Sequence, residues 1–221
     1  MNLAEHIEHT LLKQDATKKA LIKLLDEAKT HNFKGVCVNS GNIAFAKEYL
    51  KETDVKIVTV VGFPLGACIS EAKAFEAEKS VELGADEIDM VINVAKAKEH
   101  DYRYIEEEIK EVVAAAGGHT VKVILETCYL SEDEKVACTL AAARAKANFV
   151  KTSTGFGTGG ALITDIVTMK ANITQDMEVK ASGGIKTLDD ALAMVKAGAT
   201  RIGTSSGIQI VEAYLAQNEG E

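Results

Sequence analysis

The chain has 221 residues, one proline, no tryptophan and a formal net charge of -8, and 47% of its residues are hydrophobic and 26% charged. This composition is typical of a folded globular protein and excludes an intrinsically disordered chain. Only three residues are arginine, which excludes a broad basic surface for a phosphate backbone. We therefore expect no nucleic-acid partner.

No apolar run reaches the roughly 18 residues of a membrane span, and the first residues show neither the basic start nor the apolar centre of a secretion signal. We expect no membrane partner and a cytoplasmic location. The four cysteines, Cys37, Cys68, Cys128 and Cys138, form no Cys-x-x-Cys pair, which favours reduced thiols. The histidines provide no metal-ligand spacing either, so the sequence predicts chemistry without a cofactor or a metal.

Short β-branched runs alternate with longer amphipathic segments along the chain, which is typical of βα units on a parallel sheet. After a short N-terminal helical turn, we expect strands over residues 7–12, 35–39, 55–61, 87–92, 121–126, 149–152, 178–181 and 201–203. The helices are expected over residues 16–30, 42–51, 70–83, 101–116, 131–147, 161–171, 187–197 and 207–216. Ser70 is a predicted N-cap, Gly84 a predicted C-cap, and Ser131 with Glu134 a predicted capping box.

Eight βα units in 221 residues leave about 28 residues for each unit, which suffices for a strand, a helix and two short loops. No Pro-, Gly- or Ser-rich linker divides the chain. The sequence therefore predicts a single (β/α)8 TIM barrel with a short N-terminal helix, forming one domain over residues 1–221. A doubly wound open sheet is the alternative, because βα alternation does not demonstrate closure.

Charged residues occur in four predicted strands where a buried parallel strand should be apolar: Asp89, Lys122, Lys151 and Lys180. Active sites of such barrels lie at the carboxyl ends of the strands. An ammonium group among apolar neighbours and beside another ammonium group has a lowered pKa, which yields a free amine that attacks carbonyls. This arrangement predicts Schiff-base chemistry. Alternatively, each lysine only pairs with a carboxylate, as Lys122 would with Glu126 or Asp89.

Glycine- and hydroxyl-rich loops follow the predicted sixth, seventh and eighth strands, at residues 155–160, 182–184 and 203–207. Glycine allows backbone amides to approach an anion closely, and loops after strands seven and eight form phosphate sites in this barrel type. The sequence therefore predicts a phosphate ester as substrate. These glycines are alternatively only tight turns, and the match of residues 155–160 to a dinucleotide-binding motif is weak.

Seven segments together resemble the motifs of the deoxyribose-phosphate aldolase family, in the right order and over nearly the whole chain. They are residues 9–13, 36–39, 61–66, 87–93, 150–156, 179–185 and 201–206. Of these, Lys-Thr-Ser-Thr-Gly-Phe at 151–156 and Lys-Ala-Ser-Gly-Gly-Ile at 180–185 are the most specific.

The resemblance implies a cofactor-free class I aldolase that reversibly cleaves 2-deoxy-D-ribose 5-phosphate to acetaldehyde and D-glyceraldehyde 3-phosphate in deoxynucleoside catabolism. It implies that Lys151 forms the Schiff base, that Lys180 lowers the pKa of Lys151 and relays protons, and that Asp89 accepts the proton of the C3 hydroxyl. Lys122 and Thr10 would form a supporting polar shell. The phosphate would be bound by Gly155, Gly183, Gly184, Gly203, Ser205 and Ser206. The expected assembly is a homodimer or homotetramer.

Three residues depart from the pattern of the family: Glu8 stands where aspartate is common, Gln14 where proline is frequent, and Phe156 where some members have lysine. These departures concern substrate affinity more than the type of reaction. Two other functions remain open at this point. The chain could be another Schiff-base sugar-phosphate aldolase or transaldolase-like barrel, or a catalytically silent phosphosugar-binding barrel.

Overall fold

Eight parallel strands close into a barrel within residues 2–218, the part of the chain that the computed structural model describes. Each strand pairs with the next in sequence, and β8 pairs with β1. This closure confirms the predicted barrel and rules out the doubly wound open sheet. The strands are β1 Ile7–Leu11, β2 Gly35–Val38, β3 Lys56–Val61, β4 Glu87–Val91, β5 Thr120–Ile124, β6 Phe149–Lys151, β7 Glu178–Ser182 and β8 Arg201–Thr204.

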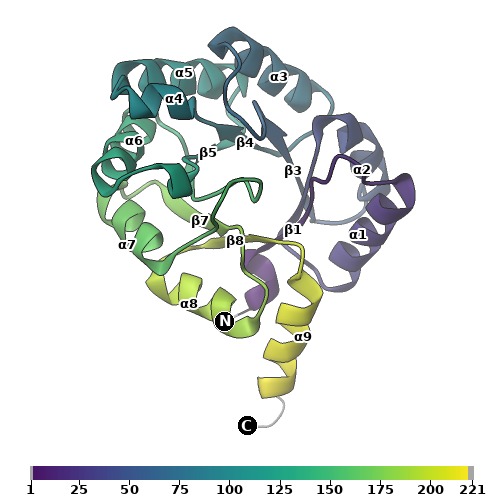
Figure 1. Ribbon diagram of the computed structural model, residues 1–221. Helices are drawn as coiled ribbons and strands as arrows, with labels where there is room; N and C mark the ends of the chain where they lie inside the picture. The colour runs from purple at the N-terminus through teal and green to yellow at the C-terminus, as the bar shows by residue number, and fades with distance from the viewer. Residues whose placement is uncertain (1, 219–221) are drawn as a thin grey trace.

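Helices surround the barrel on all sides (Figure 1). The α-helices are α1 Lys18–Thr30, α2 Ile43–Tyr49, α3 Ser70–Glu82, α4 Val94–Lys98, α5 Tyr102–Ala115, α6 Glu132–Arg144, α7 Ile163–Asn172, α8 Leu188–Ala197 and α9 Gly207–Asn218. Short 3-10 helices are η1 Leu3–His6, η2 Ser40–Asn42 and η3 Thr127–Tyr129. The N-terminal helical turn predicted from the sequence is η1, which contacts α9. No helix in residues 2–218 is long and apolar enough to cross a membrane.

The helix ends follow local capping chemistry. The capping box of Ser131 and Glu134 is present at the start of α6, as predicted. The predicted N-cap at Ser70 is wrong: Ile69 is the N-cap of α3, and Ser70 is the first helical residue. The hydroxyl of Ser70 instead donates to the Tyr104 hydroxyl at 3.2 Å. Helix α4 was not predicted from the sequence, because five residues are too few to show a helical period.

Side chains of each strand alternate between the helix layer and the barrel interior. On β4 and β5, Ile88, Met90, Val121 and Val123 pack in the main hydrophobic core, whereas Asp89 and Lys122 between them belong to no apolar cluster. The interior beside β2 and β3 is apolar, and Cys37, Val58 and Val60 form a second cluster there with Leu12. The interior beside β4 to β8 and β1 contains charged side chains, among them Glu8 on β1. The barrel therefore has an apolar side and an ionic side.

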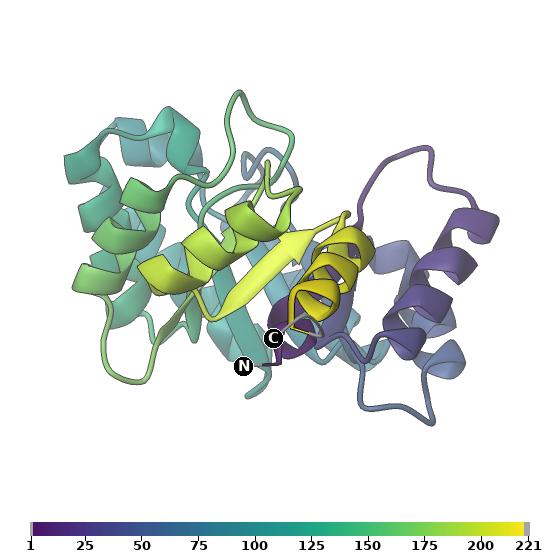
Figure 2. The ribbon, with the colours of Figure 1, turned by 90° about the horizontal axis from the view of Figure 1, so that it is seen from below.

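The loops at the carboxyl ends of the strands lie together at one end of the barrel. Figure 2 shows the loop after β6 rising at the same end as the loop between β1 and α1. In Figure 1 the loop after β6, drawn in green, lies over the centre of the barrel. Functional side chains from distant parts of the sequence therefore meet at this end.

Candidate active site

Strand register brings the four predicted charged residues together. Lys151 on β6 pairs directly with Lys180 on β7, and Asp89 on β4 pairs directly with Lys122 on β5. Because paired residues of neighbouring parallel strands point to the same face of the sheet, both pairs enter the barrel interior. All four side chains are buried, and three of them are 0% exposed. The structure therefore brings the sequence-predicted charges into one cluster.

Asp89 is the centre of this cluster. Its Oδ2 atom accepts a hydrogen bond from Lys151 Nζ at 2.7 Å and another from Lys180 Nζ at 2.7 Å. Its Oδ1 atom accepts from Lys122 Nζ at 2.9 Å. One carboxylate thus holds three ammonium groups from three consecutive strands. Of the two carboxylates considered for Lys122 from the sequence, Asp89 is its partner, and the Glu126 carboxylate is occupied by Thr154 instead.

Opposite charges fix the protonation states in this cluster. Burial would raise the pKa of Asp89, but the three neighbouring ammonium groups outweigh burial and hold that pKa well below its usual range. Burial would lower the pKa of Lys180, but the charges of Asp89 and Glu8 outweigh it and raise that pKa above its ordinary value. The expectation of a lowered pKa is therefore wrong for Lys180. The pKa of Lys122 is raised as well, since Asp89, Glu8 and Glu87 outweigh its burial. Carboxylates, and not only ammonium groups, surround these lysines.

A second layer of buried charge lies beneath this cluster and was missed from the sequence. Glu8 on β1 accepts a hydrogen bond from Lys180 and another from Arg201 Nη1 at 2.8 Å. Arg201 on β8 also donates to both carboxylate oxygens of Glu87, each at 3.1 Å, and Lys122 Nζ lies 2.5 Å from Glu87. The sequence did contain a sign of this layer, because Glu8, Glu87 and Arg201 are each a charged residue within a barrel strand. Glu8, one of the three residues that depart from the family pattern, therefore accepts a hydrogen bond from Lys180, the predicted proton relay.

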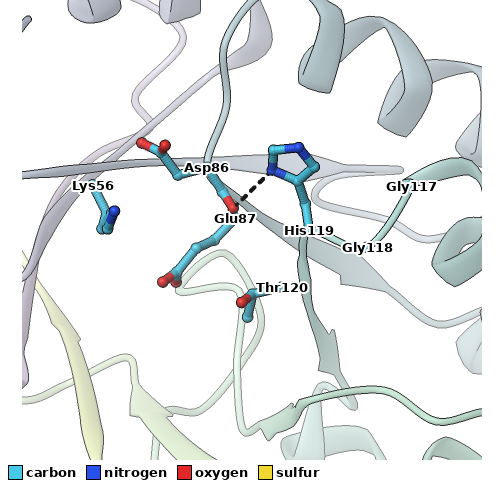
Figure 3. A pocket seen from close by; sticks show the side chains of 7 residues that line it. All are labelled: Lys56, Asp86, Glu87, Gly117, Gly118, His119 and Thr120. Atoms are coloured by element: carbon cyan, nitrogen blue, oxygen red, sulfur yellow. Dashed lines mark hydrogen bonds between the residues drawn. The ribbon is translucent and has the colours of Figure 1, made fainter.

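Glu87 begins this layer at the amino end of the barrel. Figure 3 shows it in a polar cavity of about 380 Å³ at the starts of β3, β4 and β5, where His119 Nδ1 lies 3.3 Å from the Asp86 carbonyl oxygen. The Glu87 side chain extends away from His119. Burial would raise the pKa of Glu87, but Lys122 and Arg201 lower it to about 2. The buried charges therefore extend from the amino end of the barrel to Lys151.

A second cavity, of about 350 Å³, lies at the carboxyl ends of the strands. Lys151 lines it, whereas the other buried charged residues of the cluster do not. Thr10 also lines it, and the Thr10 hydroxyl donates to the Glu8 carbonyl oxygen at 2.9 Å. Lys151 is thus the one ammonium group of the described buried cluster that a molecule in this cavity can reach.

Glycine loops line part of this cavity. Five residues predicted to bind phosphate line it: Gly155, Gly183, Gly184, Gly203 and Ser205. The sixth, Ser206, is not among the described lining residues, and its amide donates to Thr204 Oγ1 at 2.9 Å. Lys13 and Lys186 line the cavity as well and were not singled out from the sequence. They add positive charge on the side of the glycine loops.

Hydrogen bonds connect the loops after β6 and β7. The Thr152 hydroxyl donates to the Ser182 carbonyl oxygen at 3.0 Å, and the Ser182 amide donates back to that hydroxyl at 3.1 Å. The Ala161 amide donates to the Gly183 carbonyl oxygen at 2.9 Å. Gly160 packs so closely that an added Cβ would lie 2.3 Å from this carbonyl oxygen. The loops are therefore fixed relative to one another before any ligand binds.

One aromatic ring lines the cavity and contacts a second ring behind it. Phe156, one of the three residues that depart from the family pattern, lines the cavity and is half exposed. Its ring lies edge-on to that of Phe63, from the loop after β3, with 5.4 Å between the centroids.

Among residues 2–218, no three His, Cys, Asp or Glu side chains form a group that could hold a metal ion.

Comparisons with known proteins agree with this geometry. The model of the DeoC/LacD family aldolases matches residues 5–213. The chain belongs to this aldolase family. A curated deoxyribose-phosphate aldolase from Thermococcus gammatolerans is 55% identical over 216 residues, which cover 96% of each chain.

Solved structures of the aldolase family share the same barrel. A structure described as a putative deoxyribose-phosphate aldolase from Coccidioides immitis has a TM-score of 0.94 and 38% identity, and the match covers 97% of this chain and 86% of that one. The deoxyribose phosphate aldolase from Aeropyrum pernix, described as a unique tetrameric structure, has a TM-score of 0.87 and 33% identity. That match covers 97% of this chain and 92% of the other. The family resemblance noted in the sequence is therefore confirmed.

Proposed function

We propose that this protein is a Schiff-base aldolase that reversibly cleaves 2-deoxy-D-ribose 5-phosphate to acetaldehyde and D-glyceraldehyde 3-phosphate in deoxynucleoside breakdown. The observation that carries this proposal is the position of Lys151. Lys151 lines the cavity, and its Nζ atom lies 2.7 Å from a carboxylate that also binds Lys180. Membership of the aldolase family supports the proposal.

In the proposed reaction, the neutral amine of Lys151 attacks the aldehyde carbon of the open-chain sugar to give a carbinolamine. The carbinolamine hydroxyl takes up a proton from solvent and leaves as water, which gives a protonated imine. Asp89, through a water molecule, accepts the proton of the C3 hydroxyl. The electrons of the C2–C3 bond then move to the imine, which gives an enamine and releases D-glyceraldehyde 3-phosphate. Protonation of the enamine at C2 and hydrolysis of the imine release acetaldehyde and regenerate Lys151.

The shifted pKa values set the protonation states from which these proton transfers start. The low pKa of Asp89 keeps it ionised, which is the form that accepts a proton. The raised pKa of Lys180 keeps it protonated, so it is a donor in the resting enzyme. Lys122 supports this arrangement by donating a hydrogen bond to the Asp89 carboxylate, and Thr10 by donating one to the Glu8 carbonyl oxygen.

The glycine loops suit a phosphate group at the other end of the substrate. Backbone amides bind an anion without requiring a large positive surface, which agrees with a chain of net charge -8. We assign phosphate binding to five lining residues, Gly155, Gly183, Gly184, Gly203 and Ser205, together with Lys186. Ser206 remains a proposed contact through its hydroxyl, since its amide is engaged by Thr204.

The test is a coupled cleavage assay with 2-deoxyribose 5-phosphate on the wild type and on Lys151→Ala, together with borohydride trapping in the presence of acetaldehyde. We expect the wild type to turn over and to gain mass on the peptide that contains Lys151. The Lys151→Ala variant should show neither turnover nor a gain of mass on that peptide. Modification of Lys180 alone would contradict the assignment, and binding without turnover would favour a silent phosphosugar-binding barrel. Because imine chemistry needs no Lewis acid, a chelator should leave turnover unchanged.

We further propose that the chain forms one domain that self-associates as a homodimer or homotetramer in the cytoplasm. The tetrameric structure described for the Aeropyrum pernix relative supports self-association. So do the exposed apolar side chains of Leu162, Ile163 and Val167 around the start of α7. Light scattering coupled to size-exclusion chromatography measures the assembly, and a monomer at micromolar concentration would contradict it.

A further inference from the structure

Glu126 is a buried carboxylate that the proposed chemistry does not use. It lies two residues after the end of β5, and it is 3% exposed. No lysine, arginine or histidine of residues 2–218 forms an ion pair with it, whereas Asp89, Glu8 and Glu87 all have cationic partners. A buried charge without a counter-ion needs hydrogen bonds in its place. The hydrogen bonds of Glu126 come from Thr154, in the segment of residues 154–157 after β6, and from the Cys128 thiol, whose Sγ atom lies 4.0 Å from Oε1.

The segment surrounds the carboxylate. The Thr154 amide donates to Glu126 Oε1 at 3.1 Å, and the Thr154 hydroxyl donates to Oε2. The same hydroxyl accepts the Phe156 amide at 3.0 Å. Gly157 packs against the carboxyl group, since an added Cβ would lie 3.2 Å from Glu126 Cδ and 2.9 Å from Cys128 Sγ. A continuous chain of bonds therefore runs from Glu126 to the backbone of Phe156.

The backbone conformation at Glu126 also favours this contact. Its φ of 55° lies in the left-handed region, which is unfavourable for a residue other than glycine. The residues on either side are fixed to β6: the Leu125 amide donates to the Lys151 carbonyl oxygen and the Thr127 amide to the Thr152 carbonyl oxygen, both at 2.9 Å. The left-handed turn thus directs the side chain into the loop that follows Lys151.

This loop reaches the cavity at Thr154, Gly155 and Phe156, whereas Glu126 itself is not among the described lining residues. Glu126 therefore cannot act on a substrate directly. Any effect it has must pass through the position of the loop, and that position decides where the Gly155 amide and the Phe156 ring lie.

We propose that Glu126 is a positioning residue for the phosphate-binding side of the cavity: it holds residues 154–157 so that Gly155 faces the phosphate and Phe156 meets Phe63. This inference rests on the proposed function for the identity of the anion. It gives the buried, cation-free carboxylate a role in substrate affinity and none in the bond-breaking steps.

The test uses Glu126→Leu, which leaves both Thr154 donors without an acceptor, and Glu126→Gln, which keeps one oxygen and should be intermediate. Glu107→Gln, at an exposed position of α5, is the matched control. We expect KM for 2-deoxyribose 5-phosphate to rise about tenfold in Glu126→Leu and less in Glu126→Gln. The kcat/KM for unphosphorylated 2-deoxyribose should change less than about threefold. Equal losses on both substrates would show a merely structural role and overturn the proposal, as would unchanged KM values.

Binding of inorganic phosphate keeps this test separate from the proposed function. The dissociation constant is measured by NMR titration of the wild type and of each Glu126 variant. If the wild type fails to cleave the sugar phosphate, the proposed function fails, but weaker phosphate binding in the variants still supports the role of Glu126. If the wild type is active and all variants bind phosphate equally well, only the role of Glu126 fails. Should Glu126→Leu not fold, Glu126→Gln alone decides the outcome.

Discussion

The Nζ atom of Lys151 lies 2.7 Å from Oδ2 of Asp89, although 62 residues separate them in the sequence. The same oxygen is equally close to Lys180. An imine on Lys151 would therefore form beside a carboxylate that is already connected to a proton donor. This relationship gives the two lysines different tasks, because only Lys151 borders the cavity.

Asp89→Asn should lower kcat at least about 100-fold, because the variant loses the proposed proton acceptor. It should also lower the free energy of unfolding, since three buried ammonium groups lose their shared anion. The measurements are steady-state kinetics and urea denaturation. Asp133→Asn, at an exposed position of α6, controls for the change of residue type. Near wild-type turnover in a folded Asp89→Asn protein would remove Asp89 from the mechanism.

Lys180→Met should separate imine formation from turnover. We expect kcat to fall at least about 100-fold because the proton relay is lost. Borohydride with acetaldehyde should still label Lys151, because Asp89 continues to hold its amine. Mass spectrometry of the trapped protein measures this, with Lys196→Met at an exposed position as the control. Loss of labelling together with turnover would mean that Lys180 is required for the attack itself.

Glu87 should make stability depend on pH. Its pKa falls from an ordinary 4.5 to about 2 on folding, so it stabilises the folded state above pH 4.5, and this contribution is lost as the pH falls toward 2. The contribution is roughly 3 kcal/mol by the shift in pKa. Unfolding free energies measured between pH 6 and pH 3 should therefore decline less steeply in Glu87→Gln than in the wild type. An identical slope, with Glu107→Gln as reference, would contradict this origin.

Gly160→Ala should disturb the loops without changing their chemistry. The new Cβ would lie 2.3 Å from the Gly183 carbonyl oxygen, so the loops after β6 and β7 must separate. We expect a destabilisation of about 1–3 kcal/mol and a higher KM for the phosphorylated substrate. Gly41→Ala, where an added Cβ meets nothing within 4 Å, is the matched control. Equal behaviour of both variants in denaturation and kinetics would show that this contact is unimportant.

Much of the fold could be predicted from the sequence, because each strand is a β-branched run and each long helix has an apolar face. The start of every strand was found to within one residue, as with Glu87 and Arg201. Closure was predicted from the count of eight βα units alone, because no local pattern reports the pairing of β1 with β8 that closes the barrel. The cap of α3 was misplaced because a serine at the first helical position resembles an N-cap in sequence.

The candidate site was only partly predictable. Lys151, Lys180, Asp89 and Lys122 were found because each is a charge in an apolar strand. The pKa of Lys180 was predicted in the wrong direction, because its partner Glu8 is 172 residues away and no local pattern connects the two. Tertiary partners, rather than strand position, decide the protonation of these groups.

The two layers of buried charge surround Lys151 with fixed ionic groups in place of water. On the proposed mechanism, the nitrogen of Lys151 changes repeatedly between a neutral amine and a cationic imine. Water would have to reorient around it at each change, whereas carboxylates held by Lys122, Lys180 and Arg201 are already oriented. The free energy needed to orient charges around Lys151 is thus spent when the chain folds, and it is not required again in each catalytic cycle.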